Sequence, residues 1–278
     1  MNGHSFRGLA VVIVMFSLAA QGQNTCSSSS HAYLHISSIP SGELSPGDGP
    51  NDSRTEVPEV KNGLLSRTLH RGLQDQKEIY SAPFQRRNLK WDALFLAGTG
   101  ALLATDERAS TAISSKHLDL SRNISDAGLI GTAAAVGGIW ISGIKTHDDH
   151  ARETGILSLE ALANTATVYA ATQLLTGRER PLEGTGEGRF WQSNRLDSAF
   201  PSGHAIFTWS MAAVVAHEYP HPWVRWLAYG TAAAVSATRF TGKEHFPSDV
   251  VVGAALGYLI GTHIFHSHCQ VGMSEVCR

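Results

Sequence analysis

Six apolar stretches, rich in alanine and glycine, follow one another after residue 88 and are separated by short polar breaks. They cover residues 91–104, 126–144, 153–176, 203–218, 223–239 and 248–266. Their lengths, and the shortage of alternating β-branched residues, favour helices over strands. We therefore predict an all-α fold, a six-helix bundle in which small residues let the helix backbones approach closely.

The chain before this region has a different character. Arg7 precedes an apolar run over residues 9–20, and the small-x-small pattern at 20–22 follows it, which predicts a signal peptide over 1–22. Residues 23–87 are rich in serine and proline and are interpreted as a disordered or weakly structured linker, with a short helix around Leu64 to Leu73. The helical domain would then span 88–268, and 269–278 would form a tail.

Composition and charge exclude several function classes. The net charge of −2 provides no basic field for a nucleic acid partner. Three cysteines are too few for a disulfide scaffold, although Cys269 and Cys277 could either pair across a short loop or remain free thiols. The segment 146–150 has metal-ligating residue types, but we interpret it as a solvated loop. We expect neither a metal nor another cofactor.

Three short motifs lie at the borders of the predicted helices. They are Gly177-Arg178-Glu179-Arg180-Pro181, Phe200-Pro201-Ser202-Gly203-His204, and Arg239 followed by His245 and Asp249. Together they resemble the signature of the type 2 phosphatidic acid phosphatase and vanadium haloperoxidase superfamily. In that family a lysine, six residues and Arg-Pro are followed by Pro-Ser-Gly-His, and then by Ser-Arg, five residues, histidine, three residues and aspartate. The resemblance implies the fold of that family over most of 89–266.

The chain departs from this signature at two positions. Thr238 stands where the family has serine, which preserves the hydroxyl group. Gln173 stands where the family has lysine, so one cation of the phosphate site is missing, although the amide can still donate a hydrogen bond. Arg178 is a candidate for supplying the missing charge, and the alternative is an exposed loop arginine.

The motifs contain the residue types that a phosphate site needs. Arg180 and Arg239 present planar guanidinium groups suited to bidentate contacts with an oxyanion. Gly203 allows close approach of the backbone, and the N–H groups that begin the fourth helix, with Ser202, point at the same anion. Either arginine alone is more often a surface residue or a helix cap, so the prediction depends on the whole set.

The resemblance implies three catalytic roles. His245 would be the nucleophile that forms a phosphohistidine, and Asp249 would orient its ring, although a helix cap is the alternative role for Asp249. His204 would be the general acid and base, with a plain helix-capping histidine as the alternative. Because the third and fifth helices end, and the fourth and sixth begin, at these motifs, all four termini should meet at one end of the bundle and form the active site.

These observations predict a metal-independent phosphoric ester hydrolase of the acid phosphatase or lipid phosphate phosphatase type. Its substrate would be a phosphorylated lipid, an isoprenoid phosphate or a small soluble phosphoester. The alternatives are a vanadate-dependent haloperoxidase and a catalytically lapsed phosphate-binding member. Most apolar stretches are shorter than the roughly 20 residues of a membrane span, so we expect an exported, periplasmic or membrane-apposed enzyme, with an integral membrane protein as the alternative. The sequence leaves the oligomeric state open.

Overall fold

The computed structural model describes residues 64–192 and 197–277. Its α-helices are α2 (Leu64–Ser81), α3 (Leu89–Ala112), α4 (Leu118–Thr146), α5 (Asp149–Thr176), α6 (Gly203–Glu218), α7 (Pro222–Thr241) and α8 (Pro247–His268). The described residues contain no strand, which confirms the all-α prediction. Helices α3 to α8 correspond to the six apolar stretches, and α2 extends beyond the short helix expected at its start. The predicted signal peptide lies outside the described residues.

The core of the bundle is the contact between α6 and α8. Gly253, Gly257 and Gly261 lie one turn apart on α8, where an added Cβ would come within 2.8, 2.1 and 2.3 Å of backbone oxygens of α6 and of Ser202, the residue before it. Only glycine therefore permits this separation of the two backbones. The close approach fixes the start of α8 beside the start of α6, and each of these helix starts carries one of the sequence motifs.

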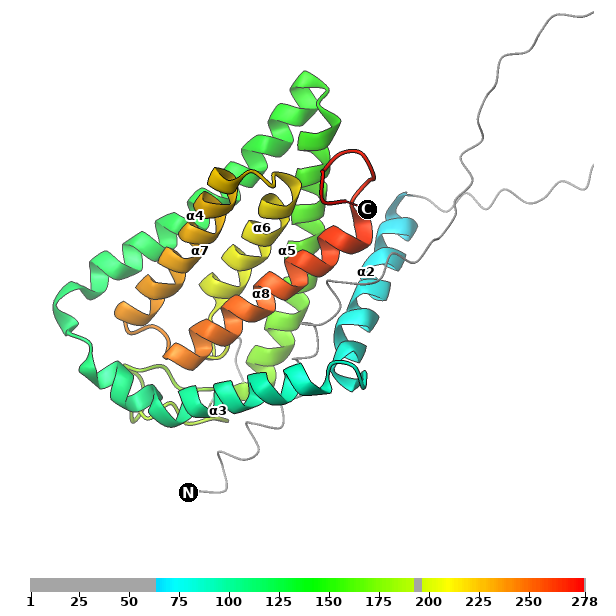
Figure 1. Ribbon diagram of the computed structural model, residues 1–278. Helices are drawn as coiled ribbons and strands as arrows, with labels where there is room; N and C mark the ends of the chain where they lie inside the picture. Colours follow the sequence, from blue (N-terminus) through cyan, green and yellow to red (C-terminus); the bar gives the residue numbers. More distant parts are fainter. Residues whose placement is uncertain (1–63, 193–196, 278) are drawn as a thin grey trace, which may run out of the picture.

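The other helices surround this pair. Helices α4 and α5 form a long hairpin, and α3 crosses the end of the bundle at which α8 begins (Figure 1). The α5 helix ends at Gly177, whose positive φ of 46° forms the left-handed C-cap. Proline occupies the first turn of both α7 and α8, where its missing N–H costs nothing.

The opposite end of the bundle is closed by the tail. Cys269 and Cys277 form a disulfide, so the pairing that the sequence left open is present. Ser274 Oγ donates to the carbonyl of His217, which attaches the tail to the end of α6. His150, from the segment with metal-ligating residue types, binds the buried Glu218 carboxylate at 2.9 Å. Within 64–192 and 197–277, no three His, Cys, Asp or Glu residues are grouped to hold a metal ion.

Two helical segments are long and apolar enough to cross a membrane, judged by length and composition alone. They are Ser115–Thr146, which contains α4, and Pro247–His268, which is α8. Of their most apolar windows, 61% is buried in α8 but only 11% in the α4 segment. Helix α8 is therefore a core helix, whereas α4 turns an apolar surface outward. Further large apolar side chains are exposed on α3, α5 and α7, including Trp91, Leu159, Trp223 and Trp226.

Candidate active site

The three motifs meet at one end of the bundle, as the order of helix termini predicts. Glu244, in the loop before α8, connects two of them through its carboxylate. Its Oε2 accepts from Arg180 at 3.0 Å and from Arg239 at 3.3 Å. The two predicted phosphate-binding arginines therefore converge on one negatively charged group.

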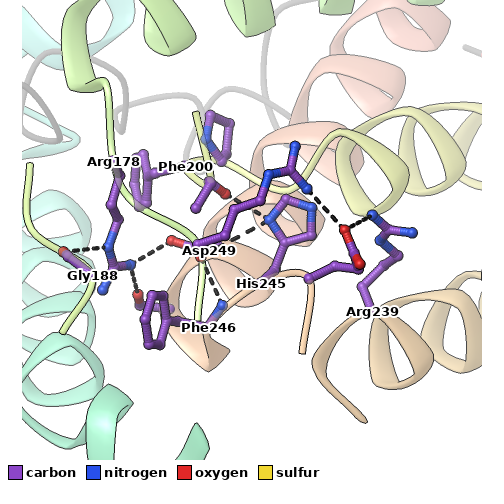
Figure 2. A network of polar contacts seen from close by, with 12 residues as sticks. Arg178, Gly188, Phe200, Arg239, His245, Phe246 and Asp249 are labelled. Atoms are coloured by element: carbon purple, nitrogen blue, oxygen red, sulfur yellow. Dashed lines mark hydrogen bonds and ion pairs between the residues drawn. The ribbon is translucent and has the colours of Figure 1, made fainter. Parts of the chain in front are cut away.

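His245 lies beside this cluster and is almost completely buried (Figure 2). Its Nδ1 lies 2.7 Å from the backbone carbonyl of Ala199. Because a carbonyl oxygen can only accept, Nδ1 carries the proton and Nε2 keeps a free lone pair. Burial, together with the charges of Arg239 and Arg180, lowers the pKa of His245 well below its usual value. The ring is therefore neutral at pH 7, as a nucleophile must be.

Asp249 is placed differently from its predicted role of orienting the His245 ring. Its Oδ2 accepts from the backbone N–H of Phe246 at 2.7 Å and lies 4.0 Å from His245 Nδ1. The hydrogen bond to that nitrogen comes instead from Ala199. Asp249 thus fixes the first turn of α8, and it influences His245 through the backbone and at longer range. Burial raises the pKa of Asp249 to about 7, although the nearby Arg178 opposes the shift.

Arg178 does not take the place of the missing lysine. Its guanidinium is buried, donates to Asp249 and to Ser248, and binds Asp106 of α3 at 2.8 Å. It also lies over the ring of Phe246, with 4.4 Å to the centroid. This network joins α3 to the start of α8 and lies on the other side of Asp249 from His245 and Arg239 (Figure 2). In this arrangement the guanidinium of Arg178 is engaged by Asp106, Ser248 and Asp249, and its predicted contact with phosphate stays a prediction.

Gln173 is likewise a buried structural residue. Its amide nitrogen donates to the carbonyl of Ser198 at 2.9 Å, and its amide oxygen accepts from the N–H of the same residue. The nitrogen also lies 3.2 Å from the carbonyl of Pro201. Gln173 thus holds the loop that leads into α6, and its amide has no capacity left for a phosphate.

His204 stands at the start of α6, on the same end as the arginines. Its Nε2 lies 2.8 Å from Oδ1 of Asp126. Burial and the charge of Arg239 lower the pKa of His204, and Asp126 opposes this shift. An imidazole held by a carboxylate at the edge of an anion site has the position of a general acid or base.

Three donors at this end of the bundle have no hydrogen-bond partner among the described residues. They are Ser202 Oγ, Arg239 Nε and Arg122 Nε. The backbone N–H of Ser202 is occupied, because it donates to the carbonyl of Asp249. The predicted contribution of Ser202 is therefore restricted to its hydroxyl group, while Gly203 begins the helix. Unsatisfied buried donors beside two arginines are the feature expected of a site that binds an oxyanion.

The first turns of α4 contribute residues that the sequence motifs do not include. Arg239 contacts Ser125 Oγ at 3.2 Å and Asp126 at 3.3 Å, and Arg122 lies 2.5 Å from Glu244. Arg122, Ser125 and Asp126 share one face of the helix through their i, i+3 and i+4 spacing. That spacing is the only signal in the sequence, and many surface helices show it.

The described residues form an all-α fold in which paired arginines, two histidines and a helix start lie together at one end. Comparison with protein families gives the particular family, since residues 155–271 match the model of the PAP2 superfamily. This segment contains all three motifs, and over it the chain is similar to the PAP2 superfamily.

Individual relatives are more distant. The lipid A 1-phosphatase of Porphyromonas gingivalis is 32% identical over 76 residues, which are 27% of this chain and 17% of that protein. The chain therefore matches only a small part of this curated relative. The crystal structure of a transmembrane PAP2-type phosphatidylglycerolphosphate phosphatase from Bacillus subtilis is 17% identical, with a TM-score of 0.43, and the match covers 74% of this chain and 97% of that one.

Proposed function

We propose that this chain is a phosphatase that hydrolyses phosphate esters through a phosphohistidine on His245. The observation that carries the proposal is the state of the His245 ring. Its Nδ1 is held by the Ala199 carbonyl, and its lowered pKa leaves Nε2 unprotonated beside two arginines. A buried histidine without a catalytic role would not need these cations, which make its protonation unfavourable.

The first step transfers the phosphoryl group to the enzyme. Arg180, Arg239 and the N–H groups at the start of α6 hold the phosphate oxygens. Nε2 of His245 attacks phosphorus while the bond from phosphorus to the ester oxygen breaks. His204 gives its proton to that oxygen, so the leaving group departs as a neutral alcohol.

The second step releases phosphate. His204, now neutral, takes a proton from a water molecule as that water attacks phosphorus. The phosphorus–nitrogen bond breaks, the electron pair returns to Nε2, and inorganic phosphate leaves. Asp126 keeps the His204 ring in place through both steps by its 2.8 Å contact.

An apolar groove supports a substrate with a hydrocarbon chain. The groove has a volume of about 650 Å³ and lies between α4, α6 and α7. Gly128, which lines the groove, is two residues from Asp126 in the sequence, and Gly131 and Ala135 continue along the same face of α4. A phosphate held by the arginines could therefore extend an apolar chain along α4. We propose a phosphorylated lipid or isoprenoid as the substrate, in agreement with the name of the P. gingivalis relative.

The test is phosphate release by the purified full chain from a prenyl diphosphate, phosphatidic acid and p-nitrophenyl phosphate, with and without EDTA. Turnover that resists EDTA and is lost in His245→Ala is expected. The matched control is His147→Asn at the opposite end, where asparagine tolerates the positive φ of 58°.

Acid-labile, base-stable 32P labelling of the wild type but not of His245→Ala would support the phosphohistidine. Unchanged turnover in His245→Ala would refute the mechanism, and bromide oxidation only with added vanadate would favour a haloperoxidase.

A further inference from the structure

The lysine position of the family signature is filled by a residue that cannot contact phosphate, so the proposed site has two arginines where three cations are expected. The described structure contains a third arginine at this place. Arg122, from the first turns of α4, lies 2.5 Å from Glu244 Oε1 through its Nε. The other carboxylate oxygen of Glu244 is the one that Arg180 and Arg239 contact.

Glu244 thus bridges three arginines that come from three different parts of the chain. Arg122 is on α4, Arg180 follows α5, and Arg239 is near the end of α7. A single carboxylate cannot satisfy this many guanidinium donors. The Nε atoms of Arg122 and Arg239 accordingly make no hydrogen bond within the described residues. A tetrahedral phosphate has more acceptor oxygens than a carboxylate and would satisfy more of these donors.

The contact between Arg122 and Glu244 is an ion pair without hydrogen-bond geometry, since Nε and Oε1 lie 2.5 Å apart but Nε makes no hydrogen bond within the described residues. The Arg122 side chain is 35% exposed and that of Glu244 is 19% exposed. Both side chains are therefore partly exposed to solvent. An exposed pair of this kind contributes little to stability, so its exchange for a ligand is feasible.

We propose that Arg122 is the third phosphate-binding cation of this site and that Glu244 is an internal counter-ion, which the substrate phosphate displaces. The inference rests on the proposed phosphatase function and adds a specific residue to it. In the free protein, Glu244 keeps three like charges together. When phosphate binds, its oxygens replace the carboxylate between the arginines.

The position of α4 supports this role for Arg122. Ser121 and Thr241 share a 3.0 Å hydrogen bond between their hydroxyl groups, which attaches the start of α4 to the end of α7. Ser125 and Asp126 bind Arg239 one turn further along. Arg122 lies between these two anchors, so its Cα is fixed relative to Arg239 even though its side chain is partly exposed.

The experiment measures binding of inorganic phosphate to the full chain by calorimetry at pH 7. Arg122→Ala is expected to weaken binding about tenfold, the lower end of the range for a charge-assisted contact because the side chain is partly exposed. Arg122→Lys, which keeps the charge, should remain within about threefold of the wild type. Arg152→Ala, a partly exposed arginine at the other end of the bundle paired with Asp149, is the matched control and should leave binding unchanged.

Glu244→Gln separates a counter-ion from a mere structural bridge. A counter-ion competes with phosphate, so its neutralisation should tighten phosphate binding about threefold or more. Weaker binding in Glu244→Gln would overturn the counter-ion role, and unchanged binding in a folded Arg122→Ala would overturn the role of Arg122. A wild type that binds phosphate but hydrolyses no ester would refute the proposed function and leave this inference intact. A wild type that binds no phosphate would overturn both.

Discussion

Each residue in the site is defined by its partners as much as by its motif. His245 is a nucleophile candidate because the Ala199 carbonyl fixes its tautomer, while Asp249, the residue expected to do so, binds the backbone of Phe246 and the Arg178 side chain. A carboxylate and a carbonyl both accept from a ring N–H, so the same tautomer results. The sequence could show which histidine was present but not which acceptor would reach it.

The pH dependence of the reaction should report the pair formed by His204 and Asp126. His204 must be protonated to act as the acid, and burial and Arg239 lower its pKa below the usual value of 6.5. Turnover should therefore fall as the pH rises through this lowered pKa, which gives an acidic optimum. His245 must be neutral, and its pKa is lowered well below the usual value. The acid limb of the profile, on which His245 becomes protonated, should therefore lie well below pH 6.5.

The variant Asp126→Asn removes the carboxylate that raises the pKa of His204. The alkaline limb of the kcat profile should then shift to lower pH, whereas the acid limb set by His245 should stay in place. Profiles of the wild type and the variant, measured from pH 4 to 8, would check this. An alkaline limb that does not move would show that Asp126 has no influence on the general acid.

Restoring the family lysine should damage this protein. Gln173 is completely buried and uses both ends of its amide on the loop before α6. Gln173→Lys would bury a charge among backbone carbonyls without a carboxylate partner, at a cost of about 3 kcal/mol or more. We expect a lower midpoint of unfolding and no gain in phosphate affinity.

Thr238→Ser, at the other departure from the signature, is the control, because its hydroxyl bonds only to its own helix. A stable, tighter-binding Gln173→Lys would contradict this account.

At the scale of the elements, α4 has two functions that its sequence does not separate. Its first turns carry polar residues into the site, and its middle is a row of small residues beside the groove. An apolar, glycine-rich stretch is equally consistent with a buried central helix and with an outer one. The burial of only 11% of its most apolar window shows that α4 is an outer helix.

The groove along α4 predicts a chain-length effect. Gly131 lines the groove and has open space at its Cβ position, whereas Gly138 has similar space but does not line it. Gly131→Leu should therefore reduce kcat/KM for a prenyl diphosphate or phosphatidic acid by about tenfold, since it would exclude about two methylene groups worth about 0.8 kcal/mol each. The same variant should hydrolyse p-nitrophenyl phosphate normally, and Gly138→Leu should affect neither. An equal loss of kcat/KM on long and short substrates would show that the groove does not bind the hydrocarbon chain of the substrate.

At the scale of the whole molecule, the distribution of apolar surface differs from that of most proteins in water. Large apolar side chains are exposed on α3, α4, α5 and α7, among them Ile130, Ile141 and Trp226, which is 80% exposed. Extended apolar surface of this kind marks contact with a membrane or a partner. The short apolar stretches in the sequence favoured a protein at most apposed to a membrane, because stretch length does not reveal which faces the fold leaves uncovered.

We therefore expect the full chain to sediment with membranes and to be released by detergent but not by 1 M salt, since the contact is apolar. Replacing Ile130, Ile141 and Ile144 on α4 by glutamine should increase the fraction released without detergent. The control replaces Ala133 and Ala134, which are exposed on the same helix and do not line the groove, by serine. A wild type that is monodisperse in buffer without detergent would contradict membrane association.

The sequence by itself determined the helical fold, the approximate bounds of α3 to α8 and the meeting of three motifs at one end. Apolar periodicity is a local property of the sequence. The chain reverses direction twice between α5 and α7, so the ends of these two helices lie at the same end of the bundle. The tertiary structure decided that Arg178 and Gln173 are structural, that Ala199 holds His245, and that α4 supplies further polar residues. Those outcomes depend on contacts between residues far apart in the chain, where many side chains of suitable type compete for the same partner and only packing selects among them.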